Sequence, residues 1–154
     1  MKKKILVLLL MLFVSSCGYE ATHSKKNMQN YNFSINELNF IGDRKVNLKI
    51  KEKLNNYIQN KKDKNFILTI SSTSEKIILV KDTAGDATSF QSTIVLNVEV
   101  LMNNKFKNNF LIKENFNYNN NSNKFDLKKY ENEIKNNLTE FATDKLIFRL
   151  SNIQ

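Results

Sequence analysis

Cys17 is the residue whose type and position together predict a specific chemistry. It is the only cysteine of the chain, and it follows Val14-Ser15-Ser16, so that an apolar residue, two small residues and a thiol form a bacterial lipobox. The thiolate of such a cysteine is the nucleophile that accepts a diacylglycerol group, and cleavage before Cys17 frees its amine for a further acyl chain. Two or three acyl chains anchor a protein firmly, because each buried methylene contributes about 0.8 kcal/mol. The alternative is a spare cysteine that follows an ordinary secretory signal.

The stretch before this cysteine has the pattern of a signal peptide. Three lysines at positions 2–4 precede an unbroken apolar run over residues 5–14. This run is about half of the ~20 residues that a transmembrane helix needs. We therefore expect three parts: a lipoprotein signal peptide over 1–16, a lipidated N-terminus and flexible tether over 17–30, and a single domain over 31–154. The tether is expected because its sequence is polar and lacks periodicity.

The charge of the chain is positive and diffuse. It has 24 Lys+Arg against 15 Asp+Glu, a formal net charge of +9, and the lysines are scattered over an asparagine-rich background with no arginine cluster. Diffuse positive charge attracts phosphate-bearing surfaces. For an exported lipoprotein we expect an anionic lipid or glycolipid as partner, and no nucleic acid.

The first half of the domain alternates between strand and helix patterns. Apolar residues alternate over 31–40 with a one-residue slip at Asn36-Glu37, which predicts a strand with a bulge. Asp43 stands at the expected N-cap of a helix over 44–60, whose apolar residues recur every four positions. A second strand follows, in which the polar residues 71–75 are either a turn or the exposed middle of one long strand.

Two further strands are predicted in the second half. Residues 82–86 form the clearest turn signal of the chain. Alternating apolar residues over 90–102 and 106–118 flank a short hairpin connection. With one helix between strands and one at the end, the order of elements predicts an α+β fold. We expect a two-layer sandwich with a mainly antiparallel sheet of about four strands and both helices packed on one face.

A long final helix completes the predicted domain. Asp126 is its expected N-cap, with Phe125 and Tyr130 placed to form a hydrophobic staple. Most aromatic side chains recur at the spacing of a buried face. Those expected in the core are Phe90, Phe106, Phe110, Phe116 and Phe141.

Candidate catalytic and metal-binding residues are few. His23 is the only histidine and lies in the predicted tether, so no Ser–His or multi-histidine site can form. Asp82 and Asp86 offer fewer oxygen ligands than a calcium loop needs. The strand glutamates are expected to face solvent as partners of lysines: Glu37, Glu99 and Glu114. We therefore expect no enzymatic activity, no cofactor and no metal site.

The N-terminus and the order of elements resemble those of the LPS-assembly lipoprotein LptE family. The lipobox runs into Cys17-Gly18-Tyr19, and the mature end of that family typically reads Cys-Gly-aromatic. The turn and strand start at 82–88, the strand hairpin, an aromatic-rich loop ending in Phe125 and a final helix carrying Phe141-Ala142 follow in the family's order. The prolines that are common after Cys-Gly-aromatic in the family are absent from this chain.

The resemblance implies an outer-membrane lipoprotein of Gram-negative bacteria, lipid-anchored on the periplasmic side. It would plug a large β-barrel, an LptD-like partner, and assist the delivery of lipopolysaccharide to the cell surface. Gly18, where inner-membrane lipoproteins carry Asp, agrees with outer-membrane sorting. The loops 81–89 and 102–105 would enter the barrel, and Lys81 and Lys105 would make charge-assisted contacts with lipopolysaccharide phosphates.

A function of another class stays open at this point. The chain would then be a periplasm-facing lipoprotein that binds a small hydrophobic or anionic ligand between sheet and helices, with no barrel partner. A barrel plug should behave poorly alone and co-purify with a β-barrel. A ligand carrier should be a stable monomer with an internal cavity.

Overall fold

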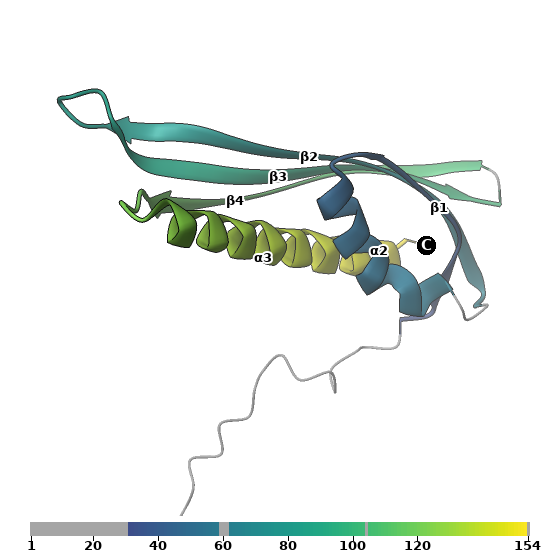
Figure 1. Ribbon diagram of the computed structural model, residues 1–154. Helices are drawn as coiled ribbons and strands as arrows, with labels where there is room; N and C mark the ends of the chain where they lie inside the picture. The colour runs from purple at the N-terminus through teal and green to yellow at the C-terminus, as the bar shows by residue number, and fades with distance from the viewer. Residues whose placement is uncertain (1–30, 59–61, 104, 154) are drawn as a thin grey trace, which may run out of the picture. The chain divides into compact units, whose positions relative to one another are not determined.

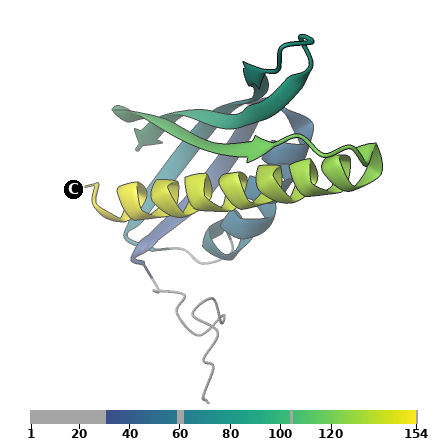
Figure 2. The same cartoon turned by 90° about the vertical axis from the view of Figure 1, so that its left-hand side faces the viewer.

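The domain is a four-stranded sheet covered on one face by two helices. The computed structural model describes residues 31–58, 62–103 and 105–153. Its elements are β1 (Phe33–Gly42), α2 (Arg44–Ile58), β2 (Lys64–Lys81), β3 (Ala87–Met102), β4 (Lys105–Asn119) and α3 (Lys124–Ser151). The strand order is β1-β2-β3-β4, with β1 parallel to β2 and the other pairs antiparallel. Both helices lie beneath the sheet in Figure 1, which confirms the predicted α+β sandwich, and Figure 2 shows α3 running along β4.

The features predicted at the N-terminus precede the first described residue, Tyr31. The signal peptide, the acylation of Cys17, the tether and His23 all lie outside the described residues. Within the described ranges, no helix has the length and apolar content that crossing a membrane requires.

The core lies between the sheet and the two helices. Alternate side chains of β3 from Ile94 to Val100 are fully buried, as are three residues of α2 spaced by four: Val46, Ile50 and Leu54. Helix α3 contributes a buried stripe that includes Leu138, Ala142 and Leu146. Burying each large aliphatic side chain contributes about 1.5–3 kcal/mol. This shared core fixes the helices against the sheet.

The structure confirms one prediction about the first strands and settles the point that was left open. The register of β1 against β2 shifts between Ile35 and Glu37, which confirms the predicted bulge. The polar residues 71–75 do not turn, because β2 is one strand of 18 residues. The pairing with β1 ends at Gly42, opposite Ser72. The second half of β2 therefore extends beyond β1.

The start of α3 differs from the prediction. Asn123 is the N-cap, and its side-chain oxygen accepts hydrogen bonds from the backbone N–H groups of Phe125 at 3.0 Å and Asp126 at 3.3 Å. Asp126 lies in the first turn of the helix instead of capping it. Phe125 is 77 % exposed, so the predicted staple with Tyr130 does not form. Asparagine is as good a capping residue as aspartate, and the helix begins three residues earlier than predicted.

Substitution of the N-cap tests this assignment. Asn123→Ala is expected to lower the free energy of unfolding by about 1 kcal/mol, because two backbone N–H groups lose their acceptor. Asp126→Ala should cost less, about 0.3–0.5 kcal/mol, because only a favourable charge near the helix N-terminus is lost. Urea unfolding of both variants measures the two values. A larger loss for Asp126→Ala would contradict the assignment.

Asp43 caps α2, as predicted, and also joins the two helices. Its Oδ1 accepts from the N–H groups of Lys45 at 2.9 Å and Val46 at 3.1 Å, and its Oδ2 accepts from Lys135 Nζ of α3 at 2.6 Å. Burial opposes ionisation of this carboxyl. The hydrogen bond from Lys135, the N–H of Val46, the charge of Lys135 and the N–H of Lys45 outweigh it, so the pKa of Asp43 lies below its ordinary value of 3.8.

This lowered pKa makes the contribution of Asp43 depend on pH. A carboxyl with a lowered pKa in the folded protein stabilises it above the unfolded pKa, and the contribution is lost as the pH falls through the folded pKa. Asp43→Asn is therefore expected to cost about 1 kcal/mol at pH 7 and progressively less below pH 3.8. Urea unfolding of both proteins at pH 7 and pH 3 tests this. A difference that stays constant with pH would exclude the Asp43–Lys135 pair as its source.

The prediction for the aromatic core is wrong at three of its five positions. Phe90 is buried and Phe110 is half-buried, but Phe106, Phe116 and Phe141 are between 46 % and 62 % exposed. A register shift between Val100 and Leu101 pairs Phe106 with Leu101, on the face away from the helices. Phe116 and Phe141 keep the core spacing, but they lie at the outer edge of the sheet and on the outer side of α3.

Candidate functional site

The two lysines proposed from the sequence as ligand contacts lie far apart. Lys81 pairs with Ala87 at one end of β3, and Lys105 pairs with Met102 at the other end. Sixteen residues of extended strand separate these ends by about 50 Å. Figure 1 shows the β2–β3 turn and the β3–β4 connection at opposite ends of the sheet. One ligand headgroup cannot contact both lysines.

The turn beside Lys81 is built by its own aspartate. Asp82 Oδ1 accepts from the N–H groups of Ala84 at 3.0 Å and Asp86 at 2.9 Å, and Gly85 adopts a φ of +90°. The carboxylate is therefore occupied by the backbone of the turn, as expected for a turn-forming residue. Among residues 31–58, 62–103 and 105–153, no group of three or more His, Cys, Asp or Glu side chains is placed to hold a metal ion.

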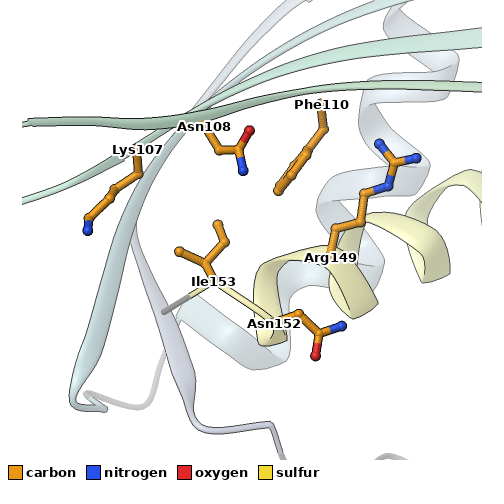
Figure 3. Close-up of a pocket in the computed structure, with 6 residues that line it drawn as sticks. All are labelled: Lys107, Asn108, Phe110, Arg149, Asn152 and Ile153. Carbon is orange, nitrogen blue, oxygen red and sulfur yellow. The ribbon is translucent and has the colours of Figure 1, made fainter.

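The end of the sheet that carries Lys105 has an open groove. The groove has a volume of about 620 Å³ and lies between the start of β4 and the C-terminal end of α3. Its lining residues are Lys107, Asn108, Phe110, Arg149, Asn152 and Ile153. Figure 3 shows Asn108 and Phe110 projecting from β4 towards the end of α3, with Arg149 rising from the helix.

A β-bulge in β4 explains how the strand reaches this groove. Val100 pairs with Asn108 and Leu101 pairs with Phe106, so Lys107 is the extra residue of β4. A bulge bends its strand and changes the direction of the side chains around it. Lys107 and Asn108 therefore both line the groove. The sequence carries no signal for this bulge, and Lys107 was not among the residues predicted to bind a ligand.

The groove combines positive charge with an aromatic ring. The Arg149 guanidinium carbon lies 5.6 Å from the centre of the Phe110 ring, and Nη1 donates to the backbone oxygen of Leu111 at 3.1 Å. No carboxylate of the described residues forms an ion pair with Lys107 or Arg149. Two cations without a protein counter-ion beside an apolar ring suit an anion that carries apolar groups.

Beside the groove, large apolar side chains are exposed on β4 and α3. Lys145 Nζ of α3 lies 2.6 Å from Glu114 Oε1 of β4, which confirms a lysine partner for that glutamate. Phe141 and Phe148 lie one turn before and after Lys145 on the same side of the helix. We define the β4–α3 apolar surface by the residues around this bridge: Phe116, Phe141 and Phe148. They are between 46 % and 61 % exposed.

A second groove, at the other end of the domain, is mostly uncharged. It holds about 680 Å³ and is lined mainly by asparagines and two tyrosines, Tyr118 and Tyr130. The Tyr118 hydroxyl donates to Glu131 Oε1 at 3.0 Å, and burial together with this carboxylate raises the pKa of Tyr118 above its ordinary range. Since no cation lines this groove, it is a weaker candidate for an anionic ligand.

Comparisons with known proteins identify the fold. The sequence matches no family model and no curated protein. Its structure resembles that of rare lipoprotein B from Shewanella oneidensis with a TM-score of 0.58 and 15 % identity over 75 % of this chain and 94 % of that one. A minor lipoprotein from Acinetobacter baumannii gives 0.57 and 11 % identity over 77 % and 92 %. Lipoprotein B from Nitrosomonas europaea gives 0.52 and 10 % identity over 77 % and 83 %. The domain therefore has the fold of these bacterial lipoproteins.

Proposed function

We propose that this chain is a lipid-anchored, non-enzymatic lipoprotein of the outer membrane that plugs a β-barrel and assists its assembly. The barrel would be an LptD-like protein that delivers lipopolysaccharide to the cell surface. The lipobox at Cys17, the resemblance to the LptE family and the fold shared with bacterial lipoproteins support this assignment.

The observation that carries the proposal is the β4–α3 apolar surface. Phe141 and Phe148 are more than half exposed although the same helix buries Leu146 completely. Soluble monomers rarely expose contiguous apolar patches, and such patches mark sites of protein or membrane contact. The wall of a barrel lumen would cover these side chains and remove them from water. Both grooves described above are open, which favours a plug over a carrier with an enclosed cavity.

The proposed contact with lipopolysaccharide is assigned to the Lys105 end of the domain. Lys105 begins the strand β4, whose Lys107 lines the groove together with Arg149. Lys81, in contrast, adjoins the acidic turn with Asp82 and Asp86. Phosphates of lipid A or of the core sugars would pair with the cations, and Phe110 would contact an acyl chain. Lys81 has no role in this contact.

Co-purification tests the proposed partnership. The full-length lipoprotein is captured from detergent-solubilised outer membranes, washed at high salt, and the retained proteins are identified by mass. We expect a β-barrel of several hundred residues at stoichiometric amounts. Phe141→Asp with Phe148→Asp should lose the barrel, because two carboxylates without partners would be buried in the contact. Asn55→Asp, an exposed change on α2, is the matched control. Recovery of the wild-type lipoprotein alone would refute the proposal.

A further inference from the structure

The second half of β2 is a free strand edge. Because β1 ends opposite Ser72, the nine residues from Thr73 to Lys81 have a strand partner on the β3 side alone. Their outward backbone N–H and C=O groups offer a ladder to another strand. Figure 1 shows this part of β2 and β3 extending beyond β1 and α2.

The side chains of this edge are apolar on both faces of the sheet. Ile77, Ile78, Leu79 and Val80 are consecutive and between 42 % and 54 % exposed. Four apolar residues in a row, three of them β-branched, form a segment that pairs readily with another strand. Leu79 lines the second groove together with Leu127 and Tyr130 of α3, but none of the four side chains is buried.

The other edge of the sheet is protected against pairing. Along β4, lysines stand at positions 105, 107 and 113, and Arg149 donates to the outward carbonyl of Leu111. Edge lysines and occupied carbonyls are devices that prevent strand addition. On the β2 edge the corresponding lysine is withdrawn, since Lys76 Nζ lies 2.5 Å from Glu131 of α3 and 3.8 Å above the Phe90 ring. The register of β2 against β3 shifts around Leu79, which makes this edge locally irregular. Its run of exposed apolar residues still makes it better suited to pairing than the lysine-rich β4 edge.

The charges that remain on this edge are self-complementary. Glu75 precedes the apolar segment and Lys81 follows it, and neither forms an ion pair with another described residue. An antiparallel pair of two such strands, related by a twofold axis near Ile78, brings Glu75 of each copy next to Lys81 of the other. The apolar residues then meet at the centre, with an ion pair at each end.

We propose that the β2 edge from Thr73 to Lys81 pairs with the same edge of a second copy of this chain, forming a continuous sheet across a twofold dimer. The pairing lies at the opposite end of the sheet from the groove that holds Lys107 and Arg149, so ligand binding and dimerisation do not compete. The inference rests on the β2 edge and not on the β4–α3 apolar surface from which the barrel partner is proposed.

Disulfide trapping in the cell envelope tests the dimer. Cys17 is the only natural cysteine, so a second cysteine placed at the twofold axis reports on the pairing. We expect full-length Ile78→Cys to form a disulfide-linked dimer under mild oxidation, at least fivefold above the wild-type chain. Leu111→Cys is the matched control, because it lies exposed beside the protected β4 edge, and it should stay at the wild-type level.

Charge exchange tests the register of the same pair. In the Ile78→Cys background, Glu75→Lys or Lys81→Glu alone should reduce the trapped dimer several-fold, since like charges then meet at both ends. The two changes together should restore the trapped dimer. If the single changes had acted by unfolding the chain, combining them would not restore it. Equal trapping at positions 78 and 111, or an adduct with a different protein in place of the dimer, would overturn the proposal.

Discussion

Gly42→Ala is expected to lower the free energy of unfolding by about 2–6 kcal/mol. Gly42 joins β1 to α2 with a φ of +97°, a conformation that side chains rarely adopt, and a Cβ there would lie 2.0 Å from the backbone oxygen of Ser72. Strain of this kind costs about 1–3 kcal/mol, and overpacking adds about 1–3 kcal/mol. The clash is with backbone that pairs β1 to β2, so no side-chain rotation relieves it.

Gly85 provides the matched control for this effect. Its φ of +90° is nearly the same, but no atom lies within 4 Å of a Cβ built at that position. Gly85→Ala should therefore cost only the conformational part, about 1–3 kcal/mol. Urea unfolding of the wild type and both variants separates the cost of backbone strain from the cost of the steric clash with Ser72. Equal losses at both positions would show that the contact with Ser72 contributes nothing.

The second large effect concerns the groove at the end of β4. Lys107→Glu with Arg149→Glu is expected to weaken binding of purified lipopolysaccharide by at least about 100-fold. Each charge-assisted contact contributes about 1.5–3 kcal/mol, and two lost contacts amount to about 3 kcal/mol or more, which is two powers of ten in the dissociation constant. Isothermal titration at low salt measures this loss.

Three further variants distinguish binding by the groove cations from attraction by the positive charge of the whole surface. Lys113→Glu changes an exposed lysine of the same strand on the face away from α3, and should alter binding less than threefold. Lys81→Glu, at the far end of the sheet, should behave likewise. Lys105→Glu, two residues before Lys107, should give an intermediate loss. Equal losses for all these variants would mean that diffuse charge alone attracts the glycolipid.

The order and type of the elements followed from sequence patterns with a clear physical basis. The spacing by four of Val46, Ile50 and Leu54 predicted the buried stripe of α2, and the one-residue slip at Asn36-Glu37 predicted the bulge in β1. Both signals are local. The alternation on either side of 103–105 also predicted the hairpin of β3 and β4 correctly.

The features that the sequence did not predict depend on contacts distant in the chain. Core spacing alone cannot tell whether a neighbouring element covers an aromatic residue. Phe116 on the edge strand β4 and Phe141 on α3 have core spacing but are exposed. The bulge at Lys107 has no local signal, because it depends on the register with β3. Lys81 and Lys105 flank the single strand β3, and their separation follows from its length.

Site-specific photo-crosslinking from Phe148 tests the central claim most directly. Phe148 is replaced in the full-length lipoprotein by p-benzoylphenylalanine, living cells are irradiated, and the adducts are identified by mass. If the β4–α3 apolar surface lies against a barrel wall, position 148 gives an adduct with a single large β-barrel protein, and the exposed control position Asn55 on α2 gives far less of it. Labelling of position 148 by lipid alone, or equal adducts from both positions, would contradict the account.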